Sequence, residues 1–486
     1  MPSSAAAIEQ ALSELFEQWA GEVPKLVLPL APSGSSRIYY RLEGGGRTAI
    51  GTYNPNEKEN AAFLTFSRHF RGKQIAVPEI YAEDLSKDIY LQEDLGFTTL
   101  YSFLLKKGDE FPEHLISLYK KVVEKLAHLQ IEGGKELDYQ ICYPREAFDK
   151  QSMLWDFNTF KYYFLKLAGI PFDEQALEED VHRFAEYLLG ADCGHFMFRD
   201  FQTRNIMIRS GDPHFIDYQG GRRGALQYDL ASLLYQAKAD IPEPIRQQLL
   251  HHYIDAAVKF LPVEREKFIE YYYGYVLIRC IQVFGTYGFR GLYERKEYFL
   301  QSIPPAIANV RWILENCGLP IEVPELRRVL ERVAACTKFE PFDKNKGASS
   351  LLKVDVGSFS YLKNGIPADT SGNGGGFVFD CRFIHNPGRY EPYKKLTGRD
   401  ESVINFLKHH SEMERFLQDV FHIVDVAIGN YIERSFTNLS IHFGCTGGQH
   451  RSVYAADAVA RHIQEKFGVP VQVQHIEQER KGWINE

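Results

Sequence analysis

The stretch "KFEPFDKNKGASS", residues 338–350, divides this chain of 486 residues into two segments with different patterns. It follows a helical run, "RRVLERVAACT", and is itself charged and rich in Gly and Ser, which is typical of a linker. Before it, β-rich runs come first and long helices follow. Beyond it, apolar strands alternate with helices. A chain of this length is expected to form two or three domains, so we predict a domain boundary at this stretch.

Residues 1–337 are predicted to form a two-lobed α+β domain. The run "LVLPLAPSGSSRIYYRLEGGGRTAIGTYNP" is β-rich and is interrupted by "SGSS" and "GGG", which indicates antiparallel hairpins. From Pro112 onward the sequence changes to long amphipathic helices such as "PEHLISLYKKVVEKLAHLQ". We place the small lobe at about residues 1–92 and the large lobe at about residues 97–337.

Residues 351–486 are predicted to form an α/β domain with a mainly parallel sheet. The runs "LLKVDVGSFSYL", "GFVFDCRFI", "LSIHFGCTG" and "VPVQVQHIE" are apolar strands, and helices lie between them. Alternation of strands and helices implies parallel strands covered by helices.

The composition argues against several classes of protein. A formal net charge of -8 is unlike the basic surface of a dedicated nucleic-acid binder. No apolar run is long enough for a membrane span, and the start "MPSSAAAIEQALSELFEQWAG" lacks the basic region of a secretory leader. The seven cysteines form no CxxC pair, which indicates reduced thiols in a cytoplasmic protein without a zinc cluster.

The segment "HFMFRDFQTRNIMIRSGDPHFIDYQG" carries a pattern suited to phosphoryl transfer. Asp200 lies five residues before Asn205, and Asp217 lies twelve residues after Asn205. Phosphoryl transfer needs a carboxylate that orients the attacking hydroxyl, and oxygen ligands for the Mg²⁺ that bridges the phosphates. Asp200 is therefore the predicted catalytic base, and Asn205 and Asp217 are the predicted metal ligands.

This segment resembles the aminoglycoside phosphotransferase family, whose members have a protein-kinase-like fold. Phe198 stands where the family has a histidine that supports the catalytic loop. The run "QYDLASLL" is similar to a later helix start of the family, which implies a loop-stabilising role for Asp229. The run "LQEDLG" is similar to the hinge between the lobes, so backbone groups around Gln92, Glu93 and Asp94 are expected to face the adenine of ATP.

One feature departs from the family pattern, which the chain follows over roughly residues 8–330. The strand "RTAIGTYNP" has no lysine to grip the α- and β-phosphates. Arg37 and Lys58 are the candidates to replace it, and the alternative is that both are solvated surface charges. Glu59 is the candidate for the helix glutamate of the small lobe. The predicted phosphate-covering loop consists of Ser33, Gly34, Ser35 and Ser36.

The runs "APSGSSRIYYRL", "NPNEKEN", "VPEIYAEDL" and "RDFQTRNIMI" resemble the AmgK-type anomeric amino-sugar kinases. The resemblance implies phosphorylation of a sugar hydroxyl, with the anomeric hydroxyl as the candidate position. The loop after Asp217 and the helix "QSMLWDFNTFKYYFL" are expected to line the acceptor pocket. Trp155, Asp156 and Arg204 are the candidate substrate residues, and a core tryptophan with a surface aspartate is the alternative interpretation.

The run "LSIHFGCTGGQHRSVYAADAVARHI" predicts a strand, a Gly-containing turn and a helix. Cys445 and Arg451 bracket five residues in the turn, which is the spacing of cysteine-dependent phosphatases. Amide groups at a helix start, together with an arginine, also bind phosphate without thiol chemistry. Because no acid-bearing loop is identifiable, we expect a phosphate-binding loop with a small buried cysteine, and a catalytic thiolate is the alternative.

The motifs "FVFDCRFIHNP", "KLTGRDESVINFL" and "GCTGGQHRSVY" resemble the C-terminal domain of RapZ-type proteins over about residues 358–480. In that family the domain binds glucosamine-6-phosphate and a regulatory RNA. Acidic and basic residues after Gly347 are nearly balanced, so RNA binding is not favoured here. Asp380 is expected either to orient Arg382 or to cap its strand. The predicted phosphosugar-binding residues are Ser358, Arg382, Asn386, Thr446, Gly447, Gly448, His450, Arg451 and Ser452.

These observations together predict a cytoplasmic kinase for a sugar or amino-sugar hydroxyl, with ATP and Mg²⁺ as cofactors. It would be fused to a phosphosugar-binding domain that could regulate it, and no membrane partner is expected. One alternative is a regulatory adaptor that senses amino-sugar phosphate through a weak or inactive kinase domain. Another is a kinase for a different small alcohol, such as an aminoglycoside, choline or homoserine.

Overall fold

The structure is a computed structural model that describes residues 5–30, 37–105, 110–318, 321–342, 352–369, 376–433 and 436–482. The predicted phosphate-covering residues Ser33, Gly34, Ser35 and Ser36 lie outside these residues. The chain forms two compact units, Met1–Pro341 and Phe342–Glu486.

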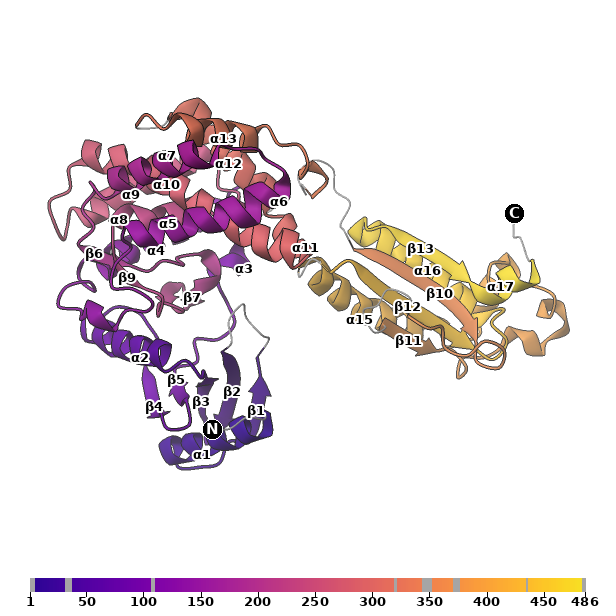
Figure 1. Cartoon of the computed structure of the whole chain (residues 1–486). Helices are drawn as coiled ribbons and strands as arrows, with labels where there is room; N and C mark the ends of the chain where they lie inside the picture. The colour runs from indigo at the N-terminus through magenta and orange to yellow at the C-terminus, as the bar shows by residue number, and fades with distance from the viewer. Residues whose placement is uncertain are drawn as a thin grey trace. The chain divides into compact units, whose positions relative to one another are not determined.

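The first unit begins with a five-stranded antiparallel sheet that packs against the helix α1 (Ala5–Ala20) (Figure 1). Apolar residues recur along α1 at helical spacing, so Leu12 and Phe16 share one buried core with Leu42 and Leu91 of the sheet. In spatial order the strands are β1 (Leu26–Pro29), β2 (Ile38–Gly44), β3 (Arg47–Tyr53), β5 (Ile89–Gln92) and β4 (Ile80–Asp84), and helix α2 (Glu57–Gly72) follows β3 in the chain.

The rest of the first unit is mainly helical, and its longest helix is α10 (Arg265–Tyr287). This helix packs against α5, α8 and α12, and it buries Tyr275, Val276 and Phe284 completely. π-helical turns extend α5 and α10, at Phe160–Leu165 and Gly288–Tyr293. The other helices are α3 (Leu100–Leu104), α4 (Glu113–Ile131), α5 (Lys150–Thr159), α6 (Lys166–Ala168), α7 (Glu174–Leu188), α8 (Leu226–Leu234), α9 (Glu243–Ala257), α11 (Glu297–Leu300), α12 (Ile303–Asn316) and α13 (Pro324–Ala334).

Two short antiparallel sheets carry the segment with the predicted catalytic residues. The strands β6 (His195–Met197) and β9 (Arg222–Gly224) pair with each other, and β7 (Ile206–Arg209) pairs with β8 (Asp212–Phe215). The loops between these strands therefore present Asp200 after β6 and Asp217 after β8.

The second unit contains a four-stranded parallel sheet in the order β11-β12-β10-β13. Helix α16 packs across β10, β12 and β13 (Figure 1). Phe416 of α15 contacts Phe379 and Phe443 of the sheet. The elements are β10 (Lys353–Ser360), β11 (Gly376–Asp380), α14 (Glu401–His409), α15 (Met413–Glu433), β12 (Asn438–Cys445), α16 (Arg451–Phe467), β13 (Val471–His475) and α17 (Ile476–Lys481).

Both fold predictions are confirmed. The first unit combines an antiparallel sheet with a helical lobe, and the second is an α/β unit with a parallel sheet. Within the described ranges, no helix has the length and apolar character needed to cross a membrane.

Candidate functional site

A cavity of about 770 Å³ is bordered by the sheet of the first unit and by the loops that follow β6 and β8. Arg37 and the segment from Gln92 to Asp94 line it from the sheet side, and Asp200, Asn205 and Asp217 line it from the other side. This volume lies within the range of small-molecule and cofactor sites. The structure thus brings most of the predicted nucleotide and catalytic residues to one cleft.

Asn205 connects the two aspartates of the predicted catalytic motif. Its Nδ2 donates to the backbone oxygen of Asp200 at 2.9 Å and lies 3.4 Å from Oδ2 of Asp217. The backbone NH of Ile216 donates to the carbonyl of Asn205 at 3.1 Å, which holds the two loops together. A carboxylate and an amide oxygen are ligands that Mg²⁺ prefers, so Asp217 and Asn205 fit the expected metal.

Arg37 lies in the cleft as the bridge between two carboxylates. Its Nη1 donates to Oδ1 of Asp217 at 2.8 Å, and its Nη2 donates to Oε2 of Glu59 in α2 at 2.7 Å. The residue is buried, with 7% of its surface exposed. Lys58 lies elsewhere, 5.9 Å from the ring centre of Tyr143. Of the two candidates for the missing lysine, Arg37 is the one placed beside the predicted metal ligands.

The electrostatic environment of Asp217 resists its ionisation. Removal of water around the carboxyl raises its pKa above the ordinary value, and repulsion from Asp200 adds to the effect. Attraction to Arg37 and a hydrogen bond of 2.8 Å from Nε2 of Gln219 to Oδ1 oppose it. A bound divalent cation would stabilise the charged form, so the raised pKa is consistent with a metal ligand.

The side chains of the predicted hinge are engaged within the protein. Nε2 of Gln92 donates to Thr52 at 3.2 Å, and Arg41 donates to both carboxylate oxygens of Asp94 at 2.5 and 2.8 Å. Glu93 forms an ion pair with Arg209. These contacts position the hinge backbone, which is the part expected to meet adenine.

Asp229 supports the loop that carries Asp200. Its carboxylate accepts hydrogen bonds from the backbone NH groups of Phe198 and Arg199 at 2.7 and 2.9 Å and from Gln130 at 2.9 Å. Burial raises the pKa of Asp229 to about 7. Phe198 is fully buried against Phe201, so an apolar ring fills the position of the family's histidine.

Asp200 also borders a second, smaller cavity of about 170 Å³. Arg279 of α10 lines this cavity, and its Nη1 lies 3.7 Å from Oδ1 of Asp200. Sequence reasoning missed Arg279, although the run "YVLIRCIQVF" places one charged residue within an otherwise apolar helix segment. Asp200 therefore stands where the two cavities meet.

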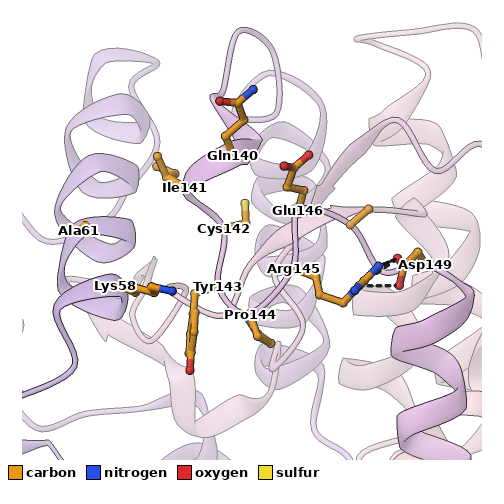
Figure 2. Close-up of a pocket in the computed structure, with 11 residues that line it drawn as sticks. Lys58, Ala61, Gln140, Ile141, Cys142, Tyr143, Pro144, Arg145, Glu146 and Asp149 are labelled. Carbon is orange, nitrogen blue, oxygen red and sulfur yellow. Dashed lines mark hydrogen bonds and ion pairs between the residues drawn. The ribbon is translucent and has the colours of Figure 1, made fainter.

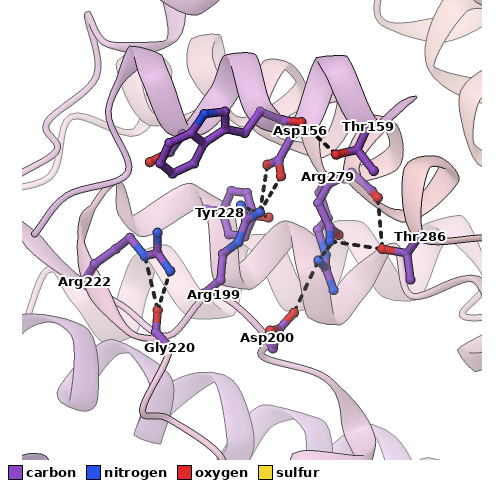
Figure 3. Close-up of polar contacts among 12 residues, drawn as sticks. Asp156, Thr159, Arg199, Asp200, Gly220, Arg222, Tyr228, Arg279 and Thr286 are labelled. Carbon is purple, nitrogen blue, oxygen red and sulfur yellow. Dashed lines mark hydrogen bonds and ion pairs between the residues drawn. The ribbon is translucent and has the colours of Figure 1, made fainter. Parts of the chain in front are cut away.

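The three candidate substrate residues have different surroundings. Both carboxylate oxygens of Asp156 accept hydrogen bonds from Arg199, at 2.6 and 2.8 Å (Figure 3). Trp155 is 44% exposed and lies under the guanidinium of Arg145. Arg204 lines the larger cavity, with its guanidinium 4.4 Å from the ring centre of Tyr101.

A third cavity, of about 690 Å³, lies between α2 and the segment that precedes α5 (Figure 2). Lys58 reaches it from α2, and Tyr143 and Arg145 line the opposite side. Arg145 is bound there to Asp149. None of the predicted catalytic residues lines this cavity, so we do not assign the phosphotransfer site to it.

In the second unit, the turn between β12 and α16 wraps around the sulfur of Cys445. The backbone NH of Gly448 donates to Sγ at 3.2 Å, and Oγ of Ser452 lies 3.1 Å from Sγ. Gly448 has a φ of +66°, and Cys445 is only 2% exposed. The thiol thus helps to shape the turn and is shielded from solvent.

Arg451, the first residue of α16, is buried beside this turn. Its Nη1 donates to the carbonyls of Arg382 and Ile384, both at 2.8 Å, and its Nη2 lies 3.4 Å from the hydroxyl of Thr446. Its Nε is buried and has no hydrogen-bond partner in the described part of the chain. His450 contacts the carbonyl of Tyr393 at 2.9 Å.

Ser358, Asn386 and Arg382, which are also predicted phosphosugar residues, form hydrogen bonds within the protein. Oγ of Ser358 lies 2.8 Å from Nδ1 of His475, and Asn386 accepts a hydrogen bond from Gly388 at 3.1 Å. Arg382 donates to both oxygens of Asp380, so Asp380 orients Arg382. His475 was missed by sequence reasoning because its partner Ser358 is distant in the chain.

The first unit thus has a cleft between its antiparallel sheet and its helical part, and the second is an α/β unit with a glycine-containing turn before α16. Residues 27–265 match the model of the Phosphotransferase enzyme family (APH), and residues 352–479 match the model of the RapZ C-terminal domain. The chain therefore combines a phosphotransferase-family domain with a RapZ C-terminal domain, as the motifs predicted.

Curated relatives and solved structures share only parts of this chain. A nucleotide-binding protein of Cereibacter sphaeroides is 39% identical over 137 residues, which is 28% of this chain and 43% of the relative. A nucleotide-binding protein of Ruminiclostridium cellulolyticum is 41% identical over 130 residues, 26% of this chain and 43% of the relative. The chain thus spans less than half the length of these relatives. Choline kinase from Cryptosporidium parvum is 13% identical, with a TM-score of 0.48 over 65% of this chain and 98% of that chain.

Proposed function

We propose that this protein is an ATP-dependent kinase that phosphorylates a hydroxyl of a sugar or amino sugar. The observation that carries the proposal is the position of Asp200 between two cavities. Asn205 and Asp217 lie on the side of the larger cavity, which has room for the nucleotide, and the smaller cavity takes the acceptor.

Each residue of the site has a role in this reaction. Asp200 accepts the proton of the attacking hydroxyl and orients it, while Asn205 and Asp217 hold Mg²⁺. Mg²⁺ supplies positive charge to the phosphates when it is bound. Arg37 orients Asp217 and places a second positive charge next to the phosphates. The backbone of the hinge contacts adenine.

The smaller cavity favours a polyol over a cationic acceptor. Its polar walls are mainly amides and hydroxyls, and Asp200 is the only carboxylate among its lining residues. Arg279 in the cavity wall would repel a cation such as choline or an aminoglycoside, whereas the amides and hydroxyls offer donors and acceptors for the hydroxyls of a sugar. The uncharged polar residues that line the cavity are Gln202, Ser232, Tyr235, Gln236, Gln282, Thr286, Tyr287 and Asn309.

We further propose that the second unit binds a phosphosugar at the turn between β12 and α16. Backbone NH groups of the turn, the start of α16 and Arg451 form a positive environment suited to a phosphate. A domain of this kind, fused to a sugar kinase, would bind the phosphorylated sugar in proportion to its concentration.

A screen for ATP consumption tests the kinase proposal. The purified full-length protein is incubated with ATP, Mg²⁺ and a panel of sugars, amino sugars and amino alcohols, and phosphorus NMR locates the phosphate on any product. We expect turnover with at least one sugar and none with choline. Turnover with amino alcohols alone, or ATP hydrolysis without a phosphorylated product, would contradict the proposal.

A further inference from the structure

The cavity between α2 and the segment that precedes α5 has no role in the proposed phosphotransfer reaction (Figure 2). Its volume of about 690 Å³ is close to the 770 Å³ of the nucleotide cavity, and both lie within the range of small-molecule sites. None of the residues that line it also lines the nucleotide cavity. The two cavities are therefore separate sites that can hold two ligands at once.

The segment that forms one wall of this cavity is held in place by the large lobe. The backbone NH of Phe148 donates to the carbonyl of Arg223 in β9 at 2.7 Å, and the NH of Arg223 donates to the carbonyl of Glu146 at 2.9 Å. The Nε of Arg145 donates to both oxygens of Asp149, at 3.1 and 3.0 Å. Because these contacts already fix the wall, a ligand that binds there pays little to order it.

Two side chains of opposite charge line the cavity without a partner. Neither Lys58 nor Glu146 forms an ion pair or a side-chain hydrogen bond with any residue in the described ranges. Figure 2 shows the amino group of Lys58 pointing from α2 toward the segment that carries Glu146. Arg145 and Asp149 neutralise each other. The walls thus offer a ligand one positive charge and one negative charge.

An aromatic ring and several apolar side chains complete the cavity. The Nζ of Lys58 lies 5.9 Å from the ring centre of Tyr143, near the outer limit of a cation–π contact. The face of this ring is therefore available to a second ring, which stacks favourably on it. The apolar lining residues are Ala61, Ile141, Pro144 and Ala147.

The first turn of α2 connects this cavity to the nucleotide site. Lys58 directly precedes Glu59, whose backbone NH donates to Oδ1 of Asn56 at 3.2 Å and whose carboxylate accepts from Arg37 at 2.7 Å. Arg37 in turn donates to Asp217 at 2.8 Å. A ligand that joins Lys58 to the fixed wall would hold this turn where Glu59 meets Arg37.

We propose that this cavity binds a zwitterionic amino acid with an aromatic side chain, as an effector that raises the affinity of the protein for ATP. The carboxylate of the effector pairs with Lys58, its ammonium group pairs with Glu146, and its ring lies beside that of Tyr143. The binding site stands independently of the proposed function, whereas the effect on ATP rests on it. Linkage requires that ATP raise the affinity for the effector by the same factor.

Three matched ligands test the binding site. Phenylalanine, phenethylamine and 3-phenylpropionate share one ring and differ only in their charged groups. Calorimetric titration of the full-length protein should give phenylalanine a dissociation constant below about 1 mM and at least about 10-fold lower than either of the others, since each charged pair adds affinity. Lys58→Ala should weaken phenylalanine about 10-fold and leave phenethylamine within about 2-fold. Glu146→Gln should weaken phenylalanine similarly and leave 3-phenylpropionate within about 2-fold.

Arg68→Ala is the control for these variants. Arg68 is another cation of α2, is exposed, and pairs with Glu83 at 2.5 Å without lining the cavity. Circular dichroism and thermal unfolding show whether each variant is folded. Equal dissociation constants for the three ligands, no binding of phenylalanine at 1 mM, or binding that is unchanged in folded Lys58→Ala would overturn the site.

A second titration tests the effect on the nucleotide. The dissociation constant of a non-hydrolysable ATP analogue with Mg²⁺ should fall at least about 5-fold when phenylalanine is saturating, and the effect should disappear in Lys58→Ala. An analogue that binds with unchanged affinity would refute the coupling. If the analogue does not bind at all, the proposed function has failed, and binding of phenylalanine that depends on Lys58 still supports the effector site.

Discussion

The guanidinium of Arg37 donates a hydrogen bond of 2.8 Å to Oδ1 of Asp217, a residue 180 positions later in the chain. The same guanidinium holds Glu59 of α2. Most kinases of the family that the sequence resembles use a strand lysine to grip the phosphates, and β3 of this chain offers none. Arg37, which directly precedes β2, brings a positive charge to the same cleft from the neighbouring strand.

Replacing Arg37 should therefore impair the use of ATP. Arg37→Ala removes a buried cation between two carboxylates, and we expect kcat/KM for ATP to fall by about 100-fold or more. Arg37→Lys keeps the charge but cannot hold both carboxylates at once, so it should restore only part of the loss. Steady-state kinetics measures both, with the exposed Arg47→Ala as the control. A loss smaller than about 3-fold in Arg37→Ala would exclude the assigned role.

Asp200→Asn should abolish turnover while nucleotide binding survives. The amide cannot accept the proton of the acceptor hydroxyl, and removal of a positioned base typically costs about 100- to 10,000-fold in rate. The dissociation constant of the ATP–Mg²⁺ complex should change by less than about 3-fold. Asp212→Asn, in the hairpin between β7 and β8, is the matched control. A turnover number for Asp200→Asn within 10-fold of wild type would remove the catalytic assignment.

Local pairing explains why part of the candidate site could be predicted from sequence. Asp200, Asn205 and Asp217 meet because one short hairpin returns the chain to Asn205, where Ile216 pairs with it. The spacing of these three residues is visible in the sequence because they lie in one continuous segment. The contact of Arg37 with Asp217 joins the two lobes, and that of Arg279 with Asp200 joins distant segments of the large lobe, so both depend on tertiary packing.

In the second unit, too, the contacts within a continuous segment were predictable and the contacts between distant segments were not. The strand, turn and helix around Cys445 are continuous in sequence. The alternation of strands and helices along the whole second unit predicted the parallel sheet. The carbonyls of Arg382 and Ile384 that hold Arg451 come from the loop after another strand. A single sequence does not show which loop the parallel sheet places beside the turn.

The buried carboxyl of Asp229 should make activity depend on pH. Burial raises its pKa to about 7, and protonation would replace an acceptor of the Phe198 and Arg199 amides with a donor. We expect kcat to fall toward acid pH with a midpoint near 7. Asp229→Asn should have a lower kcat that no longer varies between about pH 6 and 8.

The same raised pKa fixes the sign of the effect on stability. The folded protein holds this proton more tightly than the unfolded chain does. The protonated form of Asp229 therefore stabilises the folded state at low pH, and this contribution to the free energy of unfolding is lost as pH rises from about 4 through about 7. Between pH 5.5 and 8, wild type should lose about 2 kcal/mol relative to Asp229→Asn. Urea unfolding followed by tryptophan fluorescence measures this difference, and a difference independent of pH would contradict the assignment.

Neighbouring glycines in the turn of the second unit should respond differently to alanine. A Cβ at Gly448 would lie 2.7 Å from Cγ of Glu477, and the φ of this residue is +66°. A Cβ at Gly447 would meet nothing within 4 Å. Gly448→Ala should therefore weaken binding of glucosamine-6-phosphate by about 10-fold through strain in the turn, and Gly447→Ala should leave it nearly unchanged. Calorimetric titration compares them, and equal losses would show that the conformation of Gly448 is not required.

Cys445 is expected to act as a hydrogen-bond acceptor and not as a nucleophile. Its sulfur receives the NH of Gly448 at 3.2 Å and contacts Ser452 at 3.1 Å, while only 2% of the residue is exposed. Cys445→Ser should preserve binding of glucosamine-6-phosphate, since a hydroxyl also accepts this bond. Cys445→Ala leaves the buried NH unpaired, which costs about 1–3 kcal/mol and should weaken binding about 5-fold or more. Neither variant should alter the rate of p-nitrophenyl phosphate hydrolysis, and a hydrolysis rate that disappears in both would instead establish a catalytic thiolate.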